Sequence, residues 1–388
     1  MVFMEMQCLV GDEQWGRVLE LLPAGYEEAA VRLKALQRRR QIRSCGDLLR
    51  LAMAYALGDK SLRSTAAWAS SHQPWKLSSP AVLKRLRQGS EWLGWLVLES
   101  LAQREGLSSG SASWIRIVDA TVVSEPGSKG TDWRLHLVLD LVREEIRSVE
   151  LTGREGGEKL GRHPVVPGQI LLGDQGYSHR QGVSGVLERG GHLVVRLNWQ
   201  NYPLEDHEGL PIVLPQAFES LSVGQIHDQP VWFRHGTKRY MMRLVVYRKT
   251  AEPTAEALRQ IRYRAAHKKR KPHPHAALAS CFIFILTDLP ADSCPPDQVL
   301  ALYRLRWRIE TAFKQLKSVL HLDQLRAHDP RLVATYIYTK LLAAIILEDL
   351  MAQATDSPGP LPGASPPCGT GPGASAQPQQ VAVADPTL

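Results

Sequence analysis

The 388-residue sequence predicts an α/β protein that begins with an all-helical domain. Three observations support this fold class. The first hundred residues carry apolar side chains at helical spacing, short apolar runs separated by turns follow from residue 111, and a long amphipathic helical pattern returns from Asp297. We therefore expect five segments: helical residues 1–110, a first α/β part over 111–198, a β-rich insertion over 199–290, further helices over 291–353 and a tail over 354–388.

The N-terminal region predicts short helices joined by tight turns. Ser44 and Asp47 have the spacing of a capping box before a periodic apolar run, a turn at 58–60 precedes a second helix, and Ser79-Pro80 opens a third over 81–88. The pattern fits a helix-turn-helix-like DNA reader and a plain helical bundle equally well. In the first case the phosphate contacts would be Arg38, Arg39, Arg40, Lys84 and Arg85.

From residue 111 the pattern predicts a five-stranded α/β layer. The expected strands cover 114–118, 133–140, 147–152, 169–173 and 192–197, with a helix over 180–189. Asp119 and Asp174 directly follow the first and fourth strands, where carboxylates project into the crevice of an α/β sheet. A single aspartate in such a place is more often a turn former, but two of them followed by a helical glutamate point to a site.

The segment YRLRWRIETAFKQLK predicts one helix with a polar face. Tyr303, Arg306, Glu310 and Lys317 fall within roughly 60° of arc on that helix, apart from the apolar stripe. A carboxylate between cations suits phosphodiester chemistry, because the acid binds a divalent metal and the cations bind phosphate oxygens. The alternative is an ordinary solvated charged face.

The insertion carries a basic run between its expected strands at 230–234, 240–247 and 281–286. Residues 259–271 contain seven cations and no acid, with Tyr263 among them. We expect an arm that follows DNA phosphates, although such a run is often only a solvated surface. The contacts would be Arg262, Lys268, Lys269, Arg270 and Lys271. Three nearby histidines (His267, His273 and His275) lack a fourth ligand and lie beside repelling cations, which argues against zinc.

Composition favours a polyanionic partner. The net charge is +8 and the pI is near 9.3. The sequence shows no signal peptide, no membrane span and no Walker-type loop, so we expect a cytoplasmic protein without a nucleotide cofactor. Five scattered cysteines suit a reducing compartment.

The spacing Tyr303, Arg306, Glu310, Lys317, together with Asp119 and Asp174, resembles the signature of the DDE-class bacterial insertion-sequence transposases of the IS four family. The resemblance covers roughly residues 15 to 353. It implies an RNase H-like mixed five-stranded sheet with an inserted β-rich subdomain. It also implies that Asp119, Asp174 and Glu310 are the catalytic triad and hold two Mg²⁺ ions, for which Mn²⁺ would substitute. Tyr303, Arg306, Lys317 and Lys314 would contact phosphates.

The family resemblance further implies excision and insertion of an element by strand cleavage and transfer. The partners would be double-stranded DNA at the inverted repeats and target DNA, bound by a homodimer at the nucleoid. Two departures stand out: Gln175 replaces the Arg usual in relatives, and the chain from Asp356 holds eight Pro and five Gly in 33 residues without a cation. We expect this tail to be disordered, as in a truncated or frameshifted copy. One alternative is that such a copy only binds element ends; an RNase H-like nuclease of other purpose is a further alternative.

Overall fold

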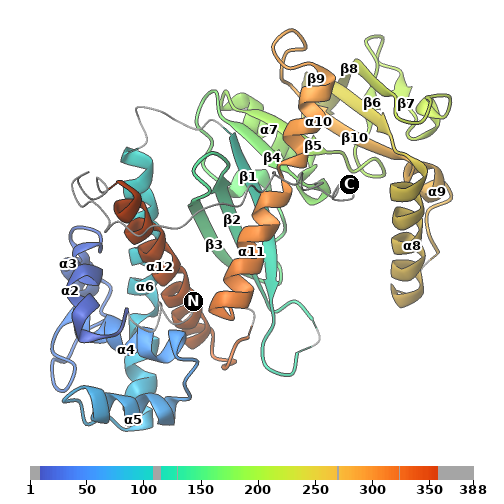
Figure 1. The fold of residues 1–388 in the computed structure, drawn as a ribbon. Coiled ribbons are helices and arrows are strands. Elements are labelled where there is room, and N and C mark those ends of the chain that lie inside the picture. Colours follow the sequence, from blue (N-terminus) through green and yellow to red (C-terminus); the bar gives the residue numbers. More distant parts are fainter. Residues whose placement is uncertain (1–8, 108–114, 129, 269–270, 323, 357–388) are drawn as a thin grey trace, which may run out of the picture.

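The computed structural model describes residues 9–107, 115–128, 130–268, 271–322 and 324–356, and Figure 1 shows their arrangement. The N-terminal region is helical as expected. Its helices are α2 (Asp12–Glu20), α3 (Tyr26–Arg32), α4 (Cys45–Leu57), α5 (Leu62–His72) and α6 (Ser79–Leu107). The capping box before α4 is present, because the Asp47 amide donates to Ser44 Oγ and the Ser44 amide donates to Asp47 Oδ2.

Helix α6 is much longer than the short third helix over 81–88 that we expected. It runs on to Leu107 because its second half carries a further apolar stripe that is buried. Gly94 lies within this half without ending the helix: a Cβ there would lie 3.1 Å from the Tyr338 ring. The glycine therefore allows close packing against the last helix of the chain.

The strands form one ten-stranded sheet with the order β3-β2-β1-β4-β5-β10-β9-β8-β6-β7. Strands β1, β4 and β5 are parallel, and the other neighbours pair antiparallel. The bounds are β1 (Ile115–Val123), β2 (Trp133–Asp140), β3 (Ile146–Gly153), β4 (Ile170–Gly173), β5 (His192–Arg196), β6 (Leu204–Glu205), β7 (Pro211–Ile212), β8 (Ile226–His235), β9 (Lys238–Arg248) and β10 (Phe282–Thr287).

The sheet is therefore wider than the expected five strands. The first five strands occupy the expected places, but the strands of the insertion extend the same sheet rather than forming a separate one. The reason is that β10 pairs directly with β5, from Ile285↔Arg196 to Thr287↔Val194. This pairing satisfies the edge of β5, which would otherwise expose unpaired backbone groups.

Side chains alternate between two buried layers along the central strands. Ile117 and Leu172 pack in the core shared with α6, α11 (Trp307–Leu320) and α12 (Pro330–Asp356), whereas Val118 and Leu171 pack in the core shared with α7 (Arg180–Glu188). Helix α10 (Pro296–Arg304) contacts β5, β8 and β9. The sheet thus has helices on both faces.

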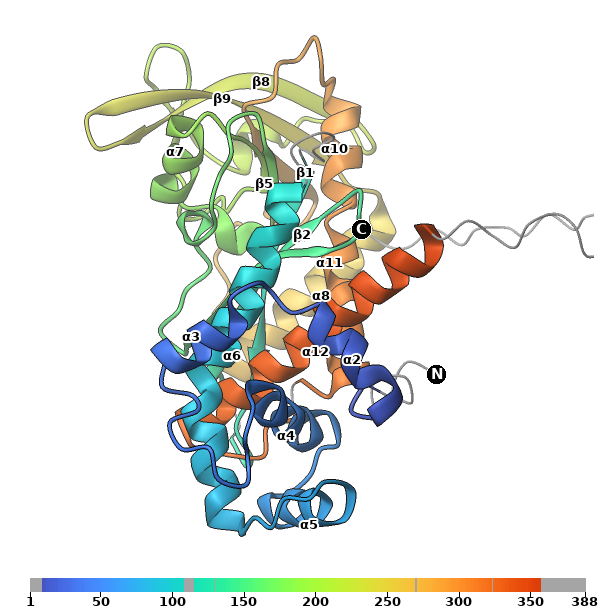
Figure 2. The ribbon, with the colours of Figure 1, turned by 90° about the vertical axis from the view of Figure 1, so that its left-hand side faces the viewer.

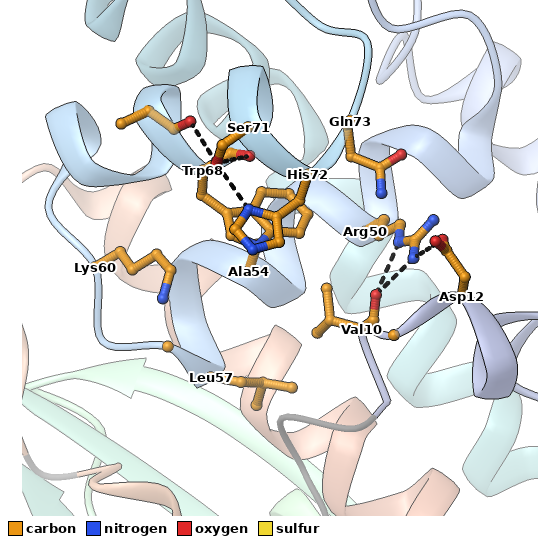
Figure 3. A pocket seen from close by; sticks show the side chains of 13 residues that line it. Val10, Asp12, Arg50, Ala54, Leu57, Lys60, Trp68, Ser71, His72 and Gln73 are labelled. Carbon is orange, nitrogen blue, oxygen red and sulfur yellow. Dashed lines mark hydrogen bonds and ion pairs between the residues drawn. The ribbon is translucent and has the colours of Figure 1, made fainter.

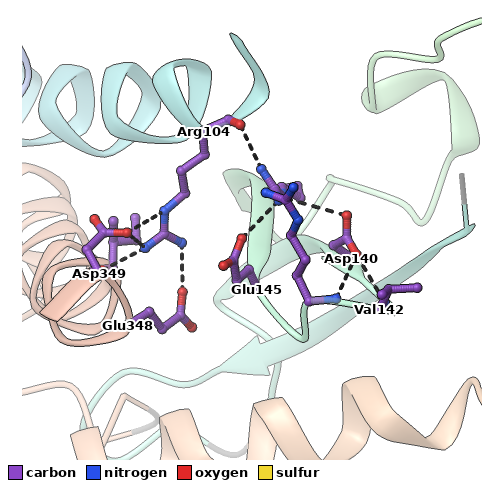
Figure 4. Close-up of polar contacts among 9 residues, drawn as sticks. Arg104, Asp140, Val142, Glu145, Glu348 and Asp349 are labelled. Atoms are coloured by element: carbon purple, nitrogen blue, oxygen red, sulfur yellow. Dashed lines mark hydrogen bonds and ion pairs between the residues drawn. The ribbon is translucent and has the colours of Figure 1, made fainter. Parts of the chain in front are cut away.

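Helix α12 returns to the N-terminal helices and packs along α6 and α4, as the two ribbon views show. Residues 330–353 have the length and hydropathy of a membrane span, but 67% of the apolar window is buried inside the protein. A buried Arg104 at the end of α6 donates to Glu348, Asp349 and the Ile345 carbonyl at 2.6–2.7 Å (Figure 4). Arg147 of β3 donates to the Arg104 carbonyl at 2.9 Å, so the network also reaches the sheet.

The basic run of the insertion forms the end of helix α8 (Ala251–Lys268), and α9 (Ala276–Ala279) follows it. Arg262 and Tyr263 are exposed on α8, and Lys271 is exposed beyond it. Lys269 and Arg270 lie outside the described residues, as does the side chain of Lys268. The Pro/Gly-rich tail from residue 357 also lies outside them.

Candidate active site

The parallel pairing of β1 with β4 places Asp119 and Asp174 side by side. Its last register pair is Val118↔Gly173, so the two aspartates occupy the next position on strands about 4.8 Å apart. Because side chains alternate, both aspartates point to the face of Ile117 and Leu172, which α11 covers. The register thus brings together two residues that lie 55 positions apart in the chain.

We expected Asp119 to follow the end of its strand, but it lies within β1. Strand β1 continues to Val123, and Asp119 is paired with Leu137 of β2. The β-branched residues after Asp119 keep the chain extended along β2 although the partner β4 has ended. Asp174, in contrast, does follow its strand, and its Oδ1 accepts from the Gly176 amide at 2.7 Å in the 3₁₀ turn η2 (Gln175–Tyr177).

The four polar residues of the helical signature do not lie on one continuous helix. Tyr303 belongs to α10, Arg306 lies at the junction, and Glu310 and Lys317 belong to α11. At this junction the amides of Leu305, Arg306, Arg308 and Ile309 bond to carbonyls three residues back instead of four. The common arc expected from ideal helix geometry is therefore wrong.

Arg306 nevertheless brings the separated acids together. Its guanidinium donates to Glu310 Oε1 at 2.7 Å and to Asp119 Oδ2 at 3.3 Å. The Tyr303 hydroxyl interacts with the same guanidinium, and burial raises the pKa of Tyr303. Arg306 thus connects the first strand, α10 and α11 at a single point.

The Asp119 carboxyl is held in an environment that disfavours its charge. Burial raises its pKa to about 7, and Asp174 and Glu158 add to this effect, against the lowering by the Ala120 amide and Arg306. A divalent cation would relieve this repulsion, and carboxylate oxygens are the ligands that Mg²⁺ and Mn²⁺ prefer. The donor types therefore fit a metal site.

The acids are not gathered around one point in the described residues. No three Asp, Glu, His or Cys side chains there have the spacing of a metal site. Glu310 is the separated member, since its side chain is 51% exposed and its carboxylate is held by Arg306. To bind a metal together with the two aspartates, the Glu310 carboxylate would have to leave Arg306 and coordinate the cation instead.

Sequence reasoning missed two further groups beside the aspartates. Glu158 lies in the coil after β3, and its pKa is raised by burial and by Asp174. Tyr177 is fully buried and has Asp119, Glu158 and Asp174 as electrostatic neighbours. Neither residue follows a periodic pattern that would single it out, although Tyr177 comes soon after Asp174 in the chain.

The remaining predicted contacts lie in three places. Lys314 is exposed and Lys317 half-buried on α11. Arg38, Arg39 and Arg40 are exposed in the loop between α3 and α4, and Lys84 is exposed on α6. The Arg85 guanidinium donates to the Arg38 carbonyl, and burial with the nearby Arg40 lowers the pKa of Arg85. The loop and the start of α6 thus form one basic cluster, distinct from Arg262 and Lys271 at α8.

Two cavities lie outside the carboxylate cluster. One of about 620 Å³ opens between α4, α5 and the segment before α2, and Figure 3 shows Arg50, Lys60, Trp68 and His72 around it. The other, of about 500 Å³, adjoins Gln175 and is lined by the cations Arg196, Lys249 and Lys271 without an acid. The second cavity is thus a basic recess next to Asp174.

Comparison with protein families gives a match to the transposase DDE domain over residues 110–346, well over half of the chain. The chain belongs to the DDE transposase family. The match spans Asp119, Asp174 and Glu310. It confirms the resemblance to insertion-sequence transposases that the signature indicated, and members of this family cleave and transfer DNA strands with the help of divalent metal ions.

The curated relatives are transposases of insertion-sequence elements. The putative transposase InsL of element IS186A from Escherichia coli K12 is 33% identical over 355 residues, which cover 89% of this chain and 96% of the relative. The transposase of IS421 from Escherichia coli is 33% identical over 356 residues, with the same shares. That of IS231F from Bacillus thuringiensis subsp. israelensis is 24% identical over 268 residues, 61% of this chain and 56% of the relative.

Among solved structures, a piggyBac transposase synaptic complex with hairpin DNA aligns with a TM-score of 0.43 at 10% identity. The alignment covers 92% of this chain and 76% of that chain. With its family and relatives established, this chain is a DNA transposase of an insertion-sequence element.

Proposed function

We propose that Asp119, Asp174 and Glu310 are the catalytic triad of this DDE transposase and that they hold two Mg²⁺ ions, for which Mn²⁺ substitutes. The observation that carries the proposal is the Val118↔Gly173 register, which sets the two aspartates side by side on the face that α11 covers. Arg306 links Asp119 to Glu310 and so keeps the third acid within reach. The strand order 3-2-1-4-5 with β1, β4 and β5 parallel supports an RNase H-like core.

The bound ions would activate the attacking water or 3′-hydroxyl and stabilise the leaving oxygen. The side chains of this chain have separate tasks. Asp119 and Asp174 fix the position of the scissile phosphate relative to the sheet. Arg306 leaves the acids and donates to the non-bridging oxygens, where charge builds in the transition state. Lys317 and Lys314 bind phosphates along α11, and the Tyr303 hydroxyl donates to a phosphate beside the cut.

The wider proposal concerns the DNA and the assembly. The basic cluster of the N-terminal helices, Arg38, Arg39, Arg40, Lys84 and Arg85, would bind double-stranded DNA at the inverted repeats. Arg262, Lys268, Lys269, Arg270 and Lys271 of the basic run would follow the phosphates of end or target DNA. The segments 1–110, 111–198, 199–290 and 291–353 would serve as reader, catalytic core, insertion and Glu-bearing helices, acting as a homodimer at the bacterial nucleoid.

The test replaces each acid with its neutral amide and measures cleavage and binding separately. Asp119→Asn, Asp174→Asn and Glu310→Gln should each abolish Mg²⁺-dependent cleavage of end DNA, because metal ligation needs the carboxylate charge. Binding of end DNA should remain near normal, because the basic cluster is unchanged. Glu252→Gln, at an exposed acid at the start of α8, is the control and should cleave normally.

Normal cleavage by one amide variant would remove that residue from the triad. A wild-type chain that binds element ends but never cuts them, with any divalent metal, would instead favour a role as an element-end binding protein.

A further inference from the structure

Glu158 is an acid that the proposed triad does not use, yet it adjoins Asp174. An ideal Cβ on Gly176 would lie 1.7 Å from Glu158 Oε2 and 3.1 Å from Asp174 Oδ1. Both carboxylate oxygens therefore lie against the same α-carbon, and only glycine at position 176 leaves room for them. The backbone joins them further, because the Gly176 amide donates to Asp174 Oδ1 at 2.7 Å.

The Glu158 carboxylate has no hydrogen bond or ion pair within the described part of the chain. Arg134 and His179 act on Glu158 as electrostatic neighbours that lower its pKa, and the Arg134 guanidinium donates to the Gly156 carbonyl at 2.8 Å. Burial and Asp174 both raise the pKa of Glu158. A half-buried carboxylate of this kind needs a positive partner.

The Tyr177 hydroxyl gives a second, independent sign of a missing partner. Its side chain is fully buried, and its oxygen lacks a hydrogen-bond partner in the described residues. Its electrostatic neighbours are Asp119, Glu158 and Asp174. Leaving a buried hydroxyl unpaired is costly, so such a group normally meets a protein atom or an ordered water. A water in the shell of a cation held by these acids would satisfy it.

We infer that Glu158 is a fourth carboxylate of the metal site, which binds, together with Asp174, a hard divalent cation or a water attached to that cation. The inference rests on the proposed function, because it takes Asp174 as a metal ligand. It also accounts for the acids that Arg306 leaves unpaired: in the described residues this guanidinium pairs with Asp119 and Glu310 but not with Asp174 or Glu158. The other two acids are left for the cation.

The test measures Mn²⁺ binding to the full-length protein without DNA, by titration calorimetry and by the paramagnetic signal of free Mn²⁺. Glu158→Gln should weaken Mn²⁺ binding by about 10-fold or more, the usual effect of losing a group that supports a metal. The matched control is Glu155→Gln, because Glu155 is exposed three residues earlier in the same coil and should leave binding unchanged. Asp174→Asn is the reference for a lost ligand.

Thermal unfolding of the metal-free protein separates metal binding from folding. Glu158→Gln should unfold at the same or a higher temperature than the wild type, because the substitution removes repulsion from Asp174. The inference is overturned if Glu158→Gln binds Mn²⁺ like the wild type while Asp174→Asn does not, or if Glu158→Gln unfolds at a lower temperature. If Asp119→Asn, Asp174→Asn and Glu310→Gln all keep Mn²⁺ binding and cleavage, the proposed function itself fails.

Discussion

Arg306 has two tasks that conflict at the level of a single residue. It neutralises Asp119 and Glu310 in the metal-free protein, and in the proposed reaction it must turn to the phosphate. A cation that enters the site competes with this guanidinium for the same oxygens. Arginine suits such a role because its planar group offers several donors at once, so that one bond can be exchanged for another.

This conflict predicts opposite effects of Arg306→Ala on two measurements. Mn²⁺ should bind more tightly to the metal-free variant, because a competing positive charge is gone. Cleavage of end DNA should slow by ~10²-fold or more, because an oriented donor to the transition state is lost. Lys314→Ala, at an exposed cation of the helix α11 that follows Arg306, is the control and should leave Mn²⁺ affinity nearly unchanged. Weaker Mn²⁺ binding to Arg306→Ala would show that the guanidinium organises the acids instead of competing for them.

Two buried histidines predict a loss of stability in acid. Burial lowers the pKa of His136 and of His163 to about 4, from an ordinary value of 6.5. Between pH 6.5 and 4 the two histidines bind protons in the unfolded chain but not in the folded chain, so the free energy of unfolding falls as the pH falls. Each histidine should contribute about 1 kcal/mol per pH unit in this range.

Urea unfolding at several pH values measures this slope. His163→Gln cannot titrate and should reduce the slope by about one histidine's share, whereas His207→Gln, at an exposed histidine, should not change it. An unchanged slope in His163→Gln would show that His163 is protonated in the folded protein.

At the scale of elements, the Arg104 network fastens α6 to α12 and to the sheet. The Arg104 side chain is 9% exposed and pairs with Glu348 and Asp349. Arg104→Met should lower the free energy of unfolding by about 3 kcal/mol, because it removes a buried guanidinium and leaves two half-buried acids without their partner. Arg87→Met is the matched control, since Arg87 of α6 pairs with Asp329, the residue before α12, and the Arg87 side chain is 44% exposed; this variant should cost under about 1 kcal/mol. Equal losses in the two variants would mean that burial of the pair does not matter here.

The elements show which features sequence reasoning can reach. Strands β2 to β5 and helix α7 were predicted nearly to the residue, because apolar runs and turns mark their ends. The extension of β1 beyond Asp119 was not predicted, because it depends on pairing with β2. The junction between α10 and α11 contains neither glycine nor proline; it arises because α10 packs against β5 and β8 while α11 packs against β1.

The candidate site likewise contains residues that the sequence indicates and one, Glu158, that it does not. Asp119, Asp174 and Glu310 were predicted because each stands at a marked place, after an apolar run or on a periodic helix, and because their order resembles a known family. Glu158 stands in a coil without a pattern. Only the approach of two distant segments at Gly176 reveals it.

At the scale of the whole molecule, the proposed DNA surface is basic and should bind in a salt-dependent manner. If Arg38, Arg39 and Arg40 each contact a phosphate, replacing all three with alanine should lower the slope of log K against log salt concentration by about 3. Fluorescence anisotropy with end DNA at several salt concentrations measures the slope. Arg234, Lys238 and Arg239, which are paired with Glu205 and Glu188, provide the control triple, for which the slope should not change. A slope that stays the same in the first triple would place the DNA elsewhere.

The return of α12 to α4 and α6 also bears on how the chain matures during synthesis. Helices α4 and α6 leave the ribosome more than two hundred residues before α12, their packing partner, is made. Until then their apolar faces are either exposed to solvent or bound by chaperones. Nascent chains halted before residue 330 should therefore remain sensitive to protease in their first hundred residues. Resistance to protease should appear only once α12 has emerged, so the part of the protein that is made first completes its packing last.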